Sequence, residues 1–177
     1  MRALALLALL LPCVACDQAA KLLAVANLKG GGEVHVVDGV FRLVYAENPG
    51  AFLGLGRNLP DAWRIALFSV GVALILFAVA FFVLKKRLAP ALFLGLALLV
   101  AGGVGNLLDR VARPGGRVVD FAVLSVGPLH TGVFNVADVQ IMAGAALIAV
   151  GARRQRRDAG NGNGDGDVGP STVAATS

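Results

Sequence analysis

Four long apolar runs constrain what this chain of 177 residues can fold into. They cover about residues 3–26, 62–84, 88–108 and 133–152, and each is close to the roughly 20 residues that a helix needs to cross a bilayer. Hydrophobic residues make up 57% of the chain and charged residues 15%, which is outside the range of soluble globular domains. The sequence therefore predicts an all-α membrane protein with four transmembrane helices.

The connection between the first two runs has a different pattern. Residues 33–45 mix alternation with β-branched side chains around Asp38-Gly39, which predicts a β-hairpin. The apolar half of residues 48–56 is suited to lie on the membrane surface. We therefore expect one small β-hairpin or amphipathic element outside the membrane, and residues 110–132 form the second connection on the same side.

Short basic clusters predict the orientation and the domain limits. Residues 85–87 and 153–157 flank apolar runs, and Arg2 lies on the same side of a four-helix arrangement. Because positive residues favour the cytoplasm, both termini are predicted to be cytoplasmic and the hairpin extracytoplasmic. One membrane domain is predicted over residues 1–157. Residues 158–177, rich in Gly, Asn, Asp, Ser and Thr, are predicted to form a disordered cytoplasmic tail.

The net charge of +5 lies largely in these clusters, so it indicates topology and not a nucleic-acid partner. Cys13 and Cys16 are the only cysteines and form no disulfide framework, and His35 and His130 lie too far apart for metal-ligand spacing. A secreted lipoprotein anchored at Cys16 is an alternative, but it predicts a soluble remainder, and three further apolar runs follow.

Two aspartates stand at the edges of apolar segments. Asp120 lies within the apolar stretch 118–121, where desolvation raises the pKa of a carboxyl. Asp138 lies one turn into the fourth run, with Asn135 as a plausible N-cap, and a helix N-terminus favours an ionised carboxylate. We therefore expect an acid/base pair in which Asp138 is the more acidic member and Asp120 carries the proton. In the alternative, Asp120 caps a turn and Asp138 pairs with Arg110.

Further polar residues gather near the same predicted membrane face. Asp17 and Lys21 are four apart on the first helix, either as an interfacial ion pair or as part of a site. Gly102, Asn106 and Arg110 are four apart on the third helix. Helix packing alone explains the glycine. It does not explain the amide and the guanidinium, so we expect a role in supporting the site.

These motifs together resemble the lipoprotein signal peptidase family, signal peptidase II, over about residues 1–152. The resemblance rests on five motifs in order: Asp17-Gln18-x-x-Lys21, Asn48-x-Gly50-Ala51-Phe52, Gly102-Gly103-x-Gly105-Asn106-Leu107-x-Asp109-Arg110, Val118-Val119-Asp120-Phe121 and Phe134-Asn135-x-Ala137-Asp138. Each motif alone is weak, whereas five in this order are specific.

The resemblance implies an aspartic endopeptidase of the bacterial cytoplasmic (inner) membrane, a target of globomycin. Such an enzyme cleaves the signal peptide from prolipoproteins on the N-terminal side of a diacylglyceryl-modified cysteine. It implies lipidated prolipoproteins and membrane lipids as partners. Acid/base chemistry by two carboxyls requires no metal and no cofactor, and nothing in the sequence demands a dimer, so we expect a monomer. The implied catalytic residues are Asp120 and Asp138, and the implied substrate-binding residues are Asp17, Lys21, Asn48, Gly50, Gly102, Asn106, Arg110, Asn135 and Ala137.

A small transporter or proton-conducting protein is the alternative from another class. It would use Asp17, Lys21, Asp109, Arg110 and Asp138 as a polar path. Such a path requires ionisable residues at several depths of the membrane. Here they cluster near one face, which favours a site at the membrane surface.

Overall fold

The structure, a computed structural model, describes residues 1–50 and 58–161; of Asp61 and of residues 154–161 it describes the backbone alone. Within these residues, four helical segments are long and apolar enough to cross a membrane, in agreement with the sequence. They are α1 (Arg2–Leu28), the continuous run of α2 (Asp61–Ile65), the π-helical turn η2 (Ala66–Gly71) and α3 (Val72–Lys85), then α4 (Pro90–Ala112), and α5 (Val136–Asn161), whose apolar part is Val136–Arg153.

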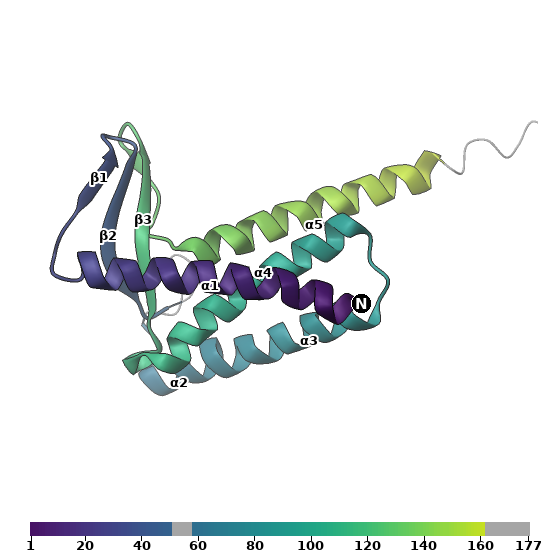
Figure 1. The fold of residues 1–177 in the computed structure, drawn as a ribbon, viewed down its shortest axis with the longest axis horizontal. Coiled ribbons are helices and arrows are strands. Elements are labelled where there is room, and N and C mark those ends of the chain that lie inside the picture. Colours follow the sequence, from purple (N-terminus) through teal and green to yellow (C-terminus); the bar gives the residue numbers. More distant parts are fainter. Residues whose placement is uncertain (51–57, 162–177) are drawn as a thin grey trace, which may run out of the picture.

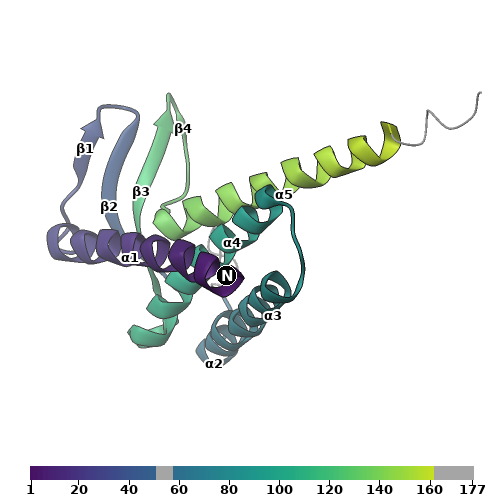
Figure 2. The same cartoon turned by 45° about the vertical axis from the view of Figure 1, so that its right-hand side comes forward.

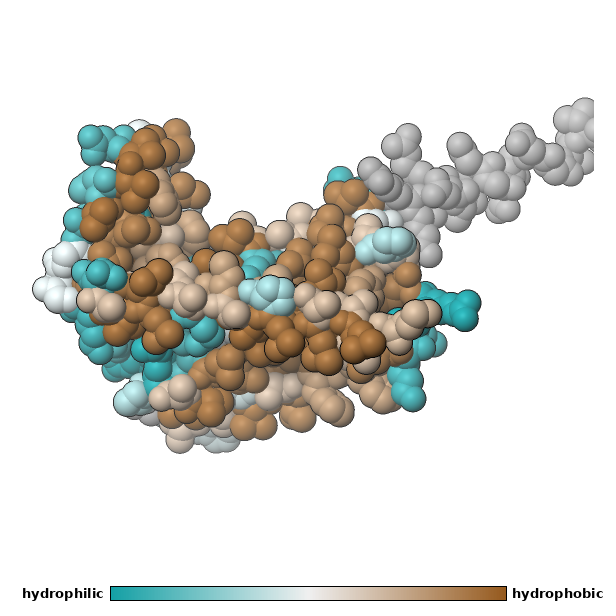
Figure 3. Space-filling model, in the orientation of Figure 1, coloured by the Kyte–Doolittle hydropathy of each residue, from teal (hydrophilic) through white to brown (hydrophobic). Residues whose placement is uncertain are grey.

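Helix α4 is the centre of the bundle. It packs against α1, α3 and α5 (Figure 1). In its most apolar stretch 44% of the residues are buried, compared with 11% to 17% in the other three spans. The outer helices therefore leave most of their apolar surface outward, as helices in lipid do. Figure 3 shows this as a continuous hydrophobic band over the helices, with hydrophilic surface at both ends.

A four-stranded antiparallel sheet lies at one end of the bundle, where the sequence predicts only a hairpin. Its order is β1 (Val34–Val37), β2 (Phe41–Asn48), β3 (Val118–Val126) and β4 (Leu129–His130) (Figure 2). The predicted hairpin is confirmed as β1 and β2, so the correction concerns β3 and β4. The fold is mostly helical, as predicted, but residues 110–132 were predicted only as a connection between two helices. Within them the β-branched run of β3 completes its hydrogen bonds with β2, which lies 70 or more residues earlier in the chain.

The segment before α5 is fixed to β3. The backbone N–H groups of Phe121 and Ala122 both donate to the carbonyl oxygen of Phe134, at 3.0 and 2.8 Å, and Phe134 N–H donates to Ala122 O at 2.9 Å. These bonds hold the start of α5 beside the middle of β3. Residues 118–121 and 134–138, which the sequence singles out, are thereby brought next to each other.

The two ends of the chain lie away from the sheet. The Arg2 guanidinium donates to the Lys86 carbonyl oxygen at 2.7 Å, so the N-terminus adjoins the basic turn between α3 and α4. Helix α5 continues to Asn161, past Arg157, after which the sequence predicts a tail. Four more helical residues follow the last basic cluster, and residues 162–177 lie outside the described part of the chain.

Candidate active site

The carboxyls of Asp120 on β3 and Asp138 on α5 line one cavity of about 720 Å³. Of the residues predicted for the site, Asn48, Asn106 and Arg110 also contribute to its wall. The remaining lining residues come mainly from β3, from the segment before α5 and from one face of α5: Val118, Leu124, His130, Thr131, Gly132, Val133, Phe134, Val139, Met142, Ala143 and Ala146.

Asp120 is held by two amides. Asn135 Nδ2 donates to Asp120 Oδ1 at 2.6 Å, and Asn48 Nδ2 donates to Oδ2 at 3.0 Å. Asn48 reaches the carboxyl because β2 pairs Ala46 with Asp120 and Asn48 with Val118, which places Asn48 diagonally on the same face of the sheet. Burial, and then the nearby Asp138, raise the pKa of Asp120 from 3.8 to about 6. The carboxyl is therefore suited to hold a proton near neutral pH.

Asp138 takes part in a reciprocal cap at the start of α5. The backbone N–H of Asp138 donates to Asn135 Oδ1 at 3.0 Å, and the backbone N–H of Asn135 donates to Asp138 Oδ2 at 3.2 Å. This is the capping-box arrangement, and it confirms Asn135 as the N-cap. Asn106 Nδ2 donates to Asp138 Oδ1 at 3.0 Å. Asn135 thus contacts both aspartates: the side chain of Asp120, and both the backbone and the side chain of Asp138.

Lys21 lies below the cavity and fixes the orientation of Asn106. Lys21 Nζ donates to Asn106 Oδ1 at 2.9 Å. Because an ammonium group only donates, the oxygen of the Asn106 amide must face Lys21 and its NH₂ must face Asp138. Asn135 Nδ2 also donates to Asn106 Oδ1, at 3.1 Å. A fully buried cation therefore determines which hydrogen bond Asp138 receives.

Two further carboxylates compensate the buried charge of Lys21. Asp17 Oδ2 lies 2.8 Å and Asp109 Oδ2 lies 3.2 Å from Lys21 Nζ. Each carboxylate also accepts a hydrogen bond from a backbone N–H group. Asp17 Oδ1 accepts a hydrogen bond from the backbone N–H of Ala137 at 2.8 Å, at the N-terminus of α5, and Asp109 Oδ2 accepts from the N–H of Val119 at 3.0 Å. The cluster joins α1, α4, β3 and α5 behind the dyad.

Glycines on α4 allow this close approach. A Cβ at Gly102 would collide with the carbonyl oxygen of Ala137 and lie 2.8 Å from Ile141 Cγ1. A Cβ at Gly105 would lie 2.5 Å from Asp17 Oδ2. Both positions therefore require glycine for α5 and the Asp17 carboxylate to reach α4. Gly102 and Ala137 shape the site by helix packing, and among the described residues neither belongs to the cavity lining.

Arg110 lies in the cavity wall and contacts backbone oxygens. Its Nη2 donates to Gly50 O at 3.0 Å and its Nη1 to Asn106 O at 3.3 Å. Gly50 N–H in turn donates to Asn48 Oδ1 at 3.0 Å. These contacts differ from the alternative in which Arg110 pairs with Asp138. Arg110 Nε is buried and has no hydrogen-bond partner among the described residues.

Seven of the eleven predicted site residues fall into two groups, and the other four, Gly50, Gly102, Asn135 and Ala137, are not among the described residues that line the cavity. Asn48, Asn106, Arg110, Asp120 and Asp138 line the cavity, while Asp17 and Lys21 lie fully buried behind it. Sequence reasoning missed the apolar wall of α5. Its signal was available, since Val139, Met142, Ala143 and Ala146 follow Asp138 on one helix face. In the described part of the chain, no three His, Cys, Asp or Glu side chains are grouped to hold a metal ion.

Known proteins are similar to this chain over most of its length. The family described as signal peptidase (SPase) II matches residues 9–153. The lipoprotein signal peptidase of Solibacter usitatus (strain Ellin6076) is 34% identical over 148 residues, 83% of this chain and 89% of that protein. That of Nitratidesulfovibrio vulgaris (strain DP4) is 36% identical over 139 residues, 78% and 83% of the two chains.

Solved structures are similar as well. One bacterial membrane enzyme has a TM-score of 0.73 at 25% identity, covering 93% of this chain and 94% of its own. A second has a TM-score of 0.69 at 26% identity, covering 82% and 90%. Nothing in these comparisons supports the transporter alternative. Because the family model matches most of the chain, and relatives at least 34% identical are covered over most of their length, this chain with four candidate membrane spans belongs to the signal peptidase II family of peptidases.

Proposed function

We propose that this protein is an aspartic endopeptidase that cleaves the signal peptide from diacylglyceryl-modified prolipoproteins, on the N-terminal side of the lipidated cysteine. The observation that carries the proposal is the pair of carboxyls, Asp120 and Asp138, in one cavity and each bound by side-chain amides. Membership of the signal peptidase II family and the names of the similar proteins supply the substrate class.

In the proposed reaction Asp138 begins as the general base and Asp120 as the general acid. Asp138 takes a proton from the water that attacks the scissile carbonyl carbon, while protonated Asp120 gives its proton to the carbonyl oxygen. The tetrahedral intermediate then collapses: the C–N bond breaks, Asp138 returns its proton to the leaving amine, and Asp120 takes back the hydroxyl proton. The raised pKa of Asp120, about 6, suits the acid role. Both carboxyls thereby return to their starting protonation states, and no covalent intermediate forms between enzyme and substrate.

Other wall residues suit substrate binding. Arg110 lies in the cavity wall, and its Nε is buried without a hydrogen-bond partner among the described residues, so we expect its guanidinium to bind a peptide oxygen of the substrate. Val139, Met142, Ala143 and Ala146 continue the wall along α5 within the span Val136–Arg153. A wall that is polar at the dyad and apolar along the span suits a peptide whose acyl chains stay in lipid. Asp17 and Lys21 position the dyad from behind.

The same proposal places the protein in the bacterial inner membrane. The contact of Arg2 with Lys86 puts the N-terminus beside a basic turn, which favours a cytoplasmic location for that end. The sheet and the dyad, at the other end of the bundle, then lie at the extracytoplasmic face. Only there does a translocated prolipoprotein present its cleavage site. We expect the enzyme to act as a monomer, because one chain supplies both carboxyls.

Cleavage of a purified prolipoprotein tests the proposal. Wild type, Asp120→Asn, Asp138→Asn and the control Asp38→Asn are compared in detergent, with a diacylglyceryl-modified precursor and an unlipidated one. We expect wild type and the control, altered in the exposed hairpin turn, to cut the lipidated form alone. Both dyad variants should remain folded and inactive. Cleavage by either dyad variant would contradict the assigned pair, and equal cutting of the unlipidated precursor would contradict the substrate class.

A further inference from the structure

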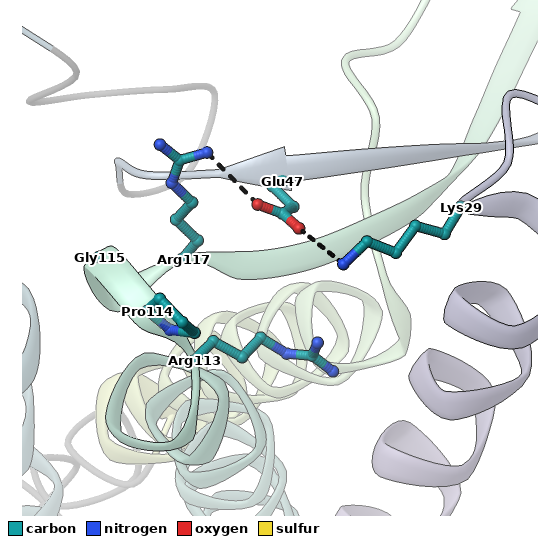
Figure 4. A pocket seen from close by; sticks show the side chains of 6 residues that line it. All are labelled: Lys29, Glu47, Arg113, Pro114, Gly115 and Arg117. Carbon is teal, nitrogen blue, oxygen red and sulfur yellow. Dashed lines mark hydrogen bonds and ion pairs between the residues drawn. The ribbon is translucent and has the colours of Figure 1, made fainter.

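A second, smaller cavity lies on the opposite face of the sheet from the dyad. Its volume is about 330 Å³. Neighbouring residues of a strand point to opposite faces, so Glu47 faces this cavity while Asn48 faces Asp120. The residues that line it come from the ends of α1 and α4, from β2 and from the turn between α4 and β3: Lys29, Glu47, Arg113, Pro114, Gly115 and Arg117 (Figure 4).

Positive charge dominates the walls of this cavity. Lys29 follows α1, Arg113 follows α4 and Arg117 precedes β3, so three cations converge from separate elements. Glu47 is the one acidic residue among the described lining residues, which leaves a net charge of +2. Figure 4 shows Arg113 and Lys29 extending toward each other from opposite sides, with both charged groups below Glu47.

Glu47 is already satisfied by its neighbours. Its Oε1 accepts a hydrogen bond from the Tyr45 hydroxyl at 2.7 Å and lies 3.7 Å from Lys29 Nζ, and its Oε2 lies 3.3 Å from an Arg117 nitrogen. The Tyr45 hydrogen bond and the nearby cations lower the pKa of Glu47, so the group is ionised. Its two long ion pairs engage only part of the donors of Lys29 and Arg117, which are about half exposed.

Arg113 is anchored from behind. Its Nε donates to Asp109 Oδ1 at 3.2 Å, and Asp109 shares its other oxygen with Lys21 and the Val119 N–H. The bond uses one edge of the guanidinium and holds the side chain in place. A guanidinium held in this way loses little rotamer freedom when it binds a planar or tetrahedral oxyanion.

The depth of the cavity identifies the kind of anion. Lys29 and Arg113 are the first residues after the spans Arg2–Leu28 and Pro90–Ala112, which places them at the level of lipid headgroups. Compensation of the helix dipoles would explain a cation at each helix end. It does not explain Arg117, which precedes a strand, or a cavity between the three. On the extracytoplasmic side such cations also oppose the positive-inside bias, so they require a purpose.

We propose that Lys29, Arg113 and Arg117 form a binding site for the phosphate group of an acidic phospholipid headgroup. The lipid lies between the ends of α1 and α4 with its phosphate under β2, and ties the sheet to the membrane surface. The site is separate from the peptidase cavity and does not rest on the peptidase chemistry. It rests on the chain being embedded in a membrane and, for the charge argument, on the orientation proposed above.

Lipid retention by the purified full chain tests this site. The protein in a neutral detergent is titrated with phosphatidylglycerol or with phosphatidylcholine of the same acyl chains, and bound lipid is counted by native mass spectrometry. We expect an affinity for phosphatidylglycerol about tenfold higher, since each basic residue near a membrane surface contributes favourably. Arg117→Gln and Lys29→Gln should each lose most of that preference.

Arg42→Gln is the matched control. Arg42 also lies on the sheet and pairs with a glutamate, its Nη1 2.8 Å from Glu33 Oε1, but it is not among the residues that line the cavity. This variant should keep the wild-type preference. Equal losses in Arg42→Gln and Arg117→Gln would show general surface charge and overturn the site, and so would no loss in Arg117→Gln and Lys29→Gln.

Competition separates the two sources of a phosphate group. Inorganic phosphate and glycerol phosphate carry the same oxyanion without acyl chains. If the site takes a lipid, both should displace bound phosphatidylglycerol only at concentrations far above that of the lipid. Displacement by inorganic phosphate at the same concentration as the lipid would overturn the lipid assignment and identify a site for the free anion.

Discussion

At Asp120, the burial that suits the carboxyl to proton transfer also disfavours its ionised form in the folded protein. Its pKa is about 6 in the fold and 3.8 without these surroundings. Between these values the folded protein holds a proton that the unfolded chain releases. The free energy of unfolding therefore falls as pH rises from about 4 to about 6, by up to about 3 kcal/mol.

Asp120→Asn removes this titration. The apparent melting temperature of the variant, relative to wild type, should therefore rise by several degrees between pH 4 and pH 7.5. One amide hydrogen bond, from Asn48 or Asn135, is lost at every pH, so the pH-dependent part of the difference is the informative one. Thermal unfolding in detergent measures it, with Asp38→Asn expected to follow wild type at each pH. A constant difference would contradict a raised pKa.

The second prediction concerns the contribution of buried Lys21 to the free energy of unfolding. With no exposed surface, it compensates both Asp17 and Asp109. Lys21→Met should lower the free energy of unfolding by about 3–5 kcal/mol, because it leaves buried carboxylates without a counter-charge. Thermal unfolding in detergent checks this, and the exposed Lys29→Met should cost less than about 1 kcal/mol. The double variant Asp17→Asn/Lys21→Met should recover part of the loss; no recovery would mean that Lys21 acts by packing alone.

The site residues differ in how far the sequence reveals them. The two aspartates and Asn135 were identifiable because apolar flanks and an N-cap pattern are local. The sequence did not show which of the other predicted residues line the cavity and which lie buried behind it, since this depends on packing between α1 and α4. Nothing near Lys21 in the sequence says that it contacts Asn106, 85 residues later. The sequence suggested that Lys21 belongs to the site, but only the fold shows that Lys21 orients the side-chain amide of Asn106.

Among the elements, the strands show the same limit. The hairpin of β1 and β2 was predictable because its turn and both strands are contiguous. Strand β3 has an apolar, β-branched sequence, but its partner β2 is distant in the chain, and a connection between spans gave no reason to expect a sheet. The bounds of the spanning helices were close to those predicted, because hydropathy alone determines them.

The contact between α4 and α5 yields a prediction at Gly102. Gly102→Ala places a methyl group against the carbonyl oxygen of Ala137, one residue before Asp138, so the two helices must separate. Asn106 and Asp138 then move apart, and a shift of about 1 Å can cost roughly 100-fold in rate. We expect kcat/KM for a lipidated precursor to fall by about that factor.

Gly151→Ala is the matched control for Gly102→Ala. It lies on the same pair of helices, where an added Cβ would meet Ala91 Cβ at an ordinary 3.8 Å. Both variants gain the same helix propensity from alanine, so their difference isolates the collision. Near-wild-type activity in Gly102→Ala would show that α5 relaxes without disturbing the dyad.

For the molecule as a whole, the orientation in the membrane connects the sheet, the dyad and the lipid site. Figure 1 shows the sheet and the start of α5, the elements that carry the dyad, at the end of the bundle away from the N-terminus, which adjoins the basic turn of residues 85–87. Cysteine accessibility tests their placement. In a background with Cys13 and Cys16 replaced by alanine, a cysteine is introduced either at Asp38, in the hairpin turn, or at Arg87, in the basic turn; both positions are exposed.

A membrane-impermeant maleimide added to intact spheroplasts should label Asp38→Cys, and should label Arg87→Cys only after the membrane is permeabilised. The reason is that the positive-inside bias predicts a cytoplasmic location for the basic turn and for the N-terminus beside it. The reverse pattern would place the dyad in the cytoplasm, where a translocated prolipoprotein could not reach it, and would contradict the proposed function. Labelling of both positions before permeabilisation would instead contradict the assignment of the basic turn alone, since the hairpin would still face the substrate.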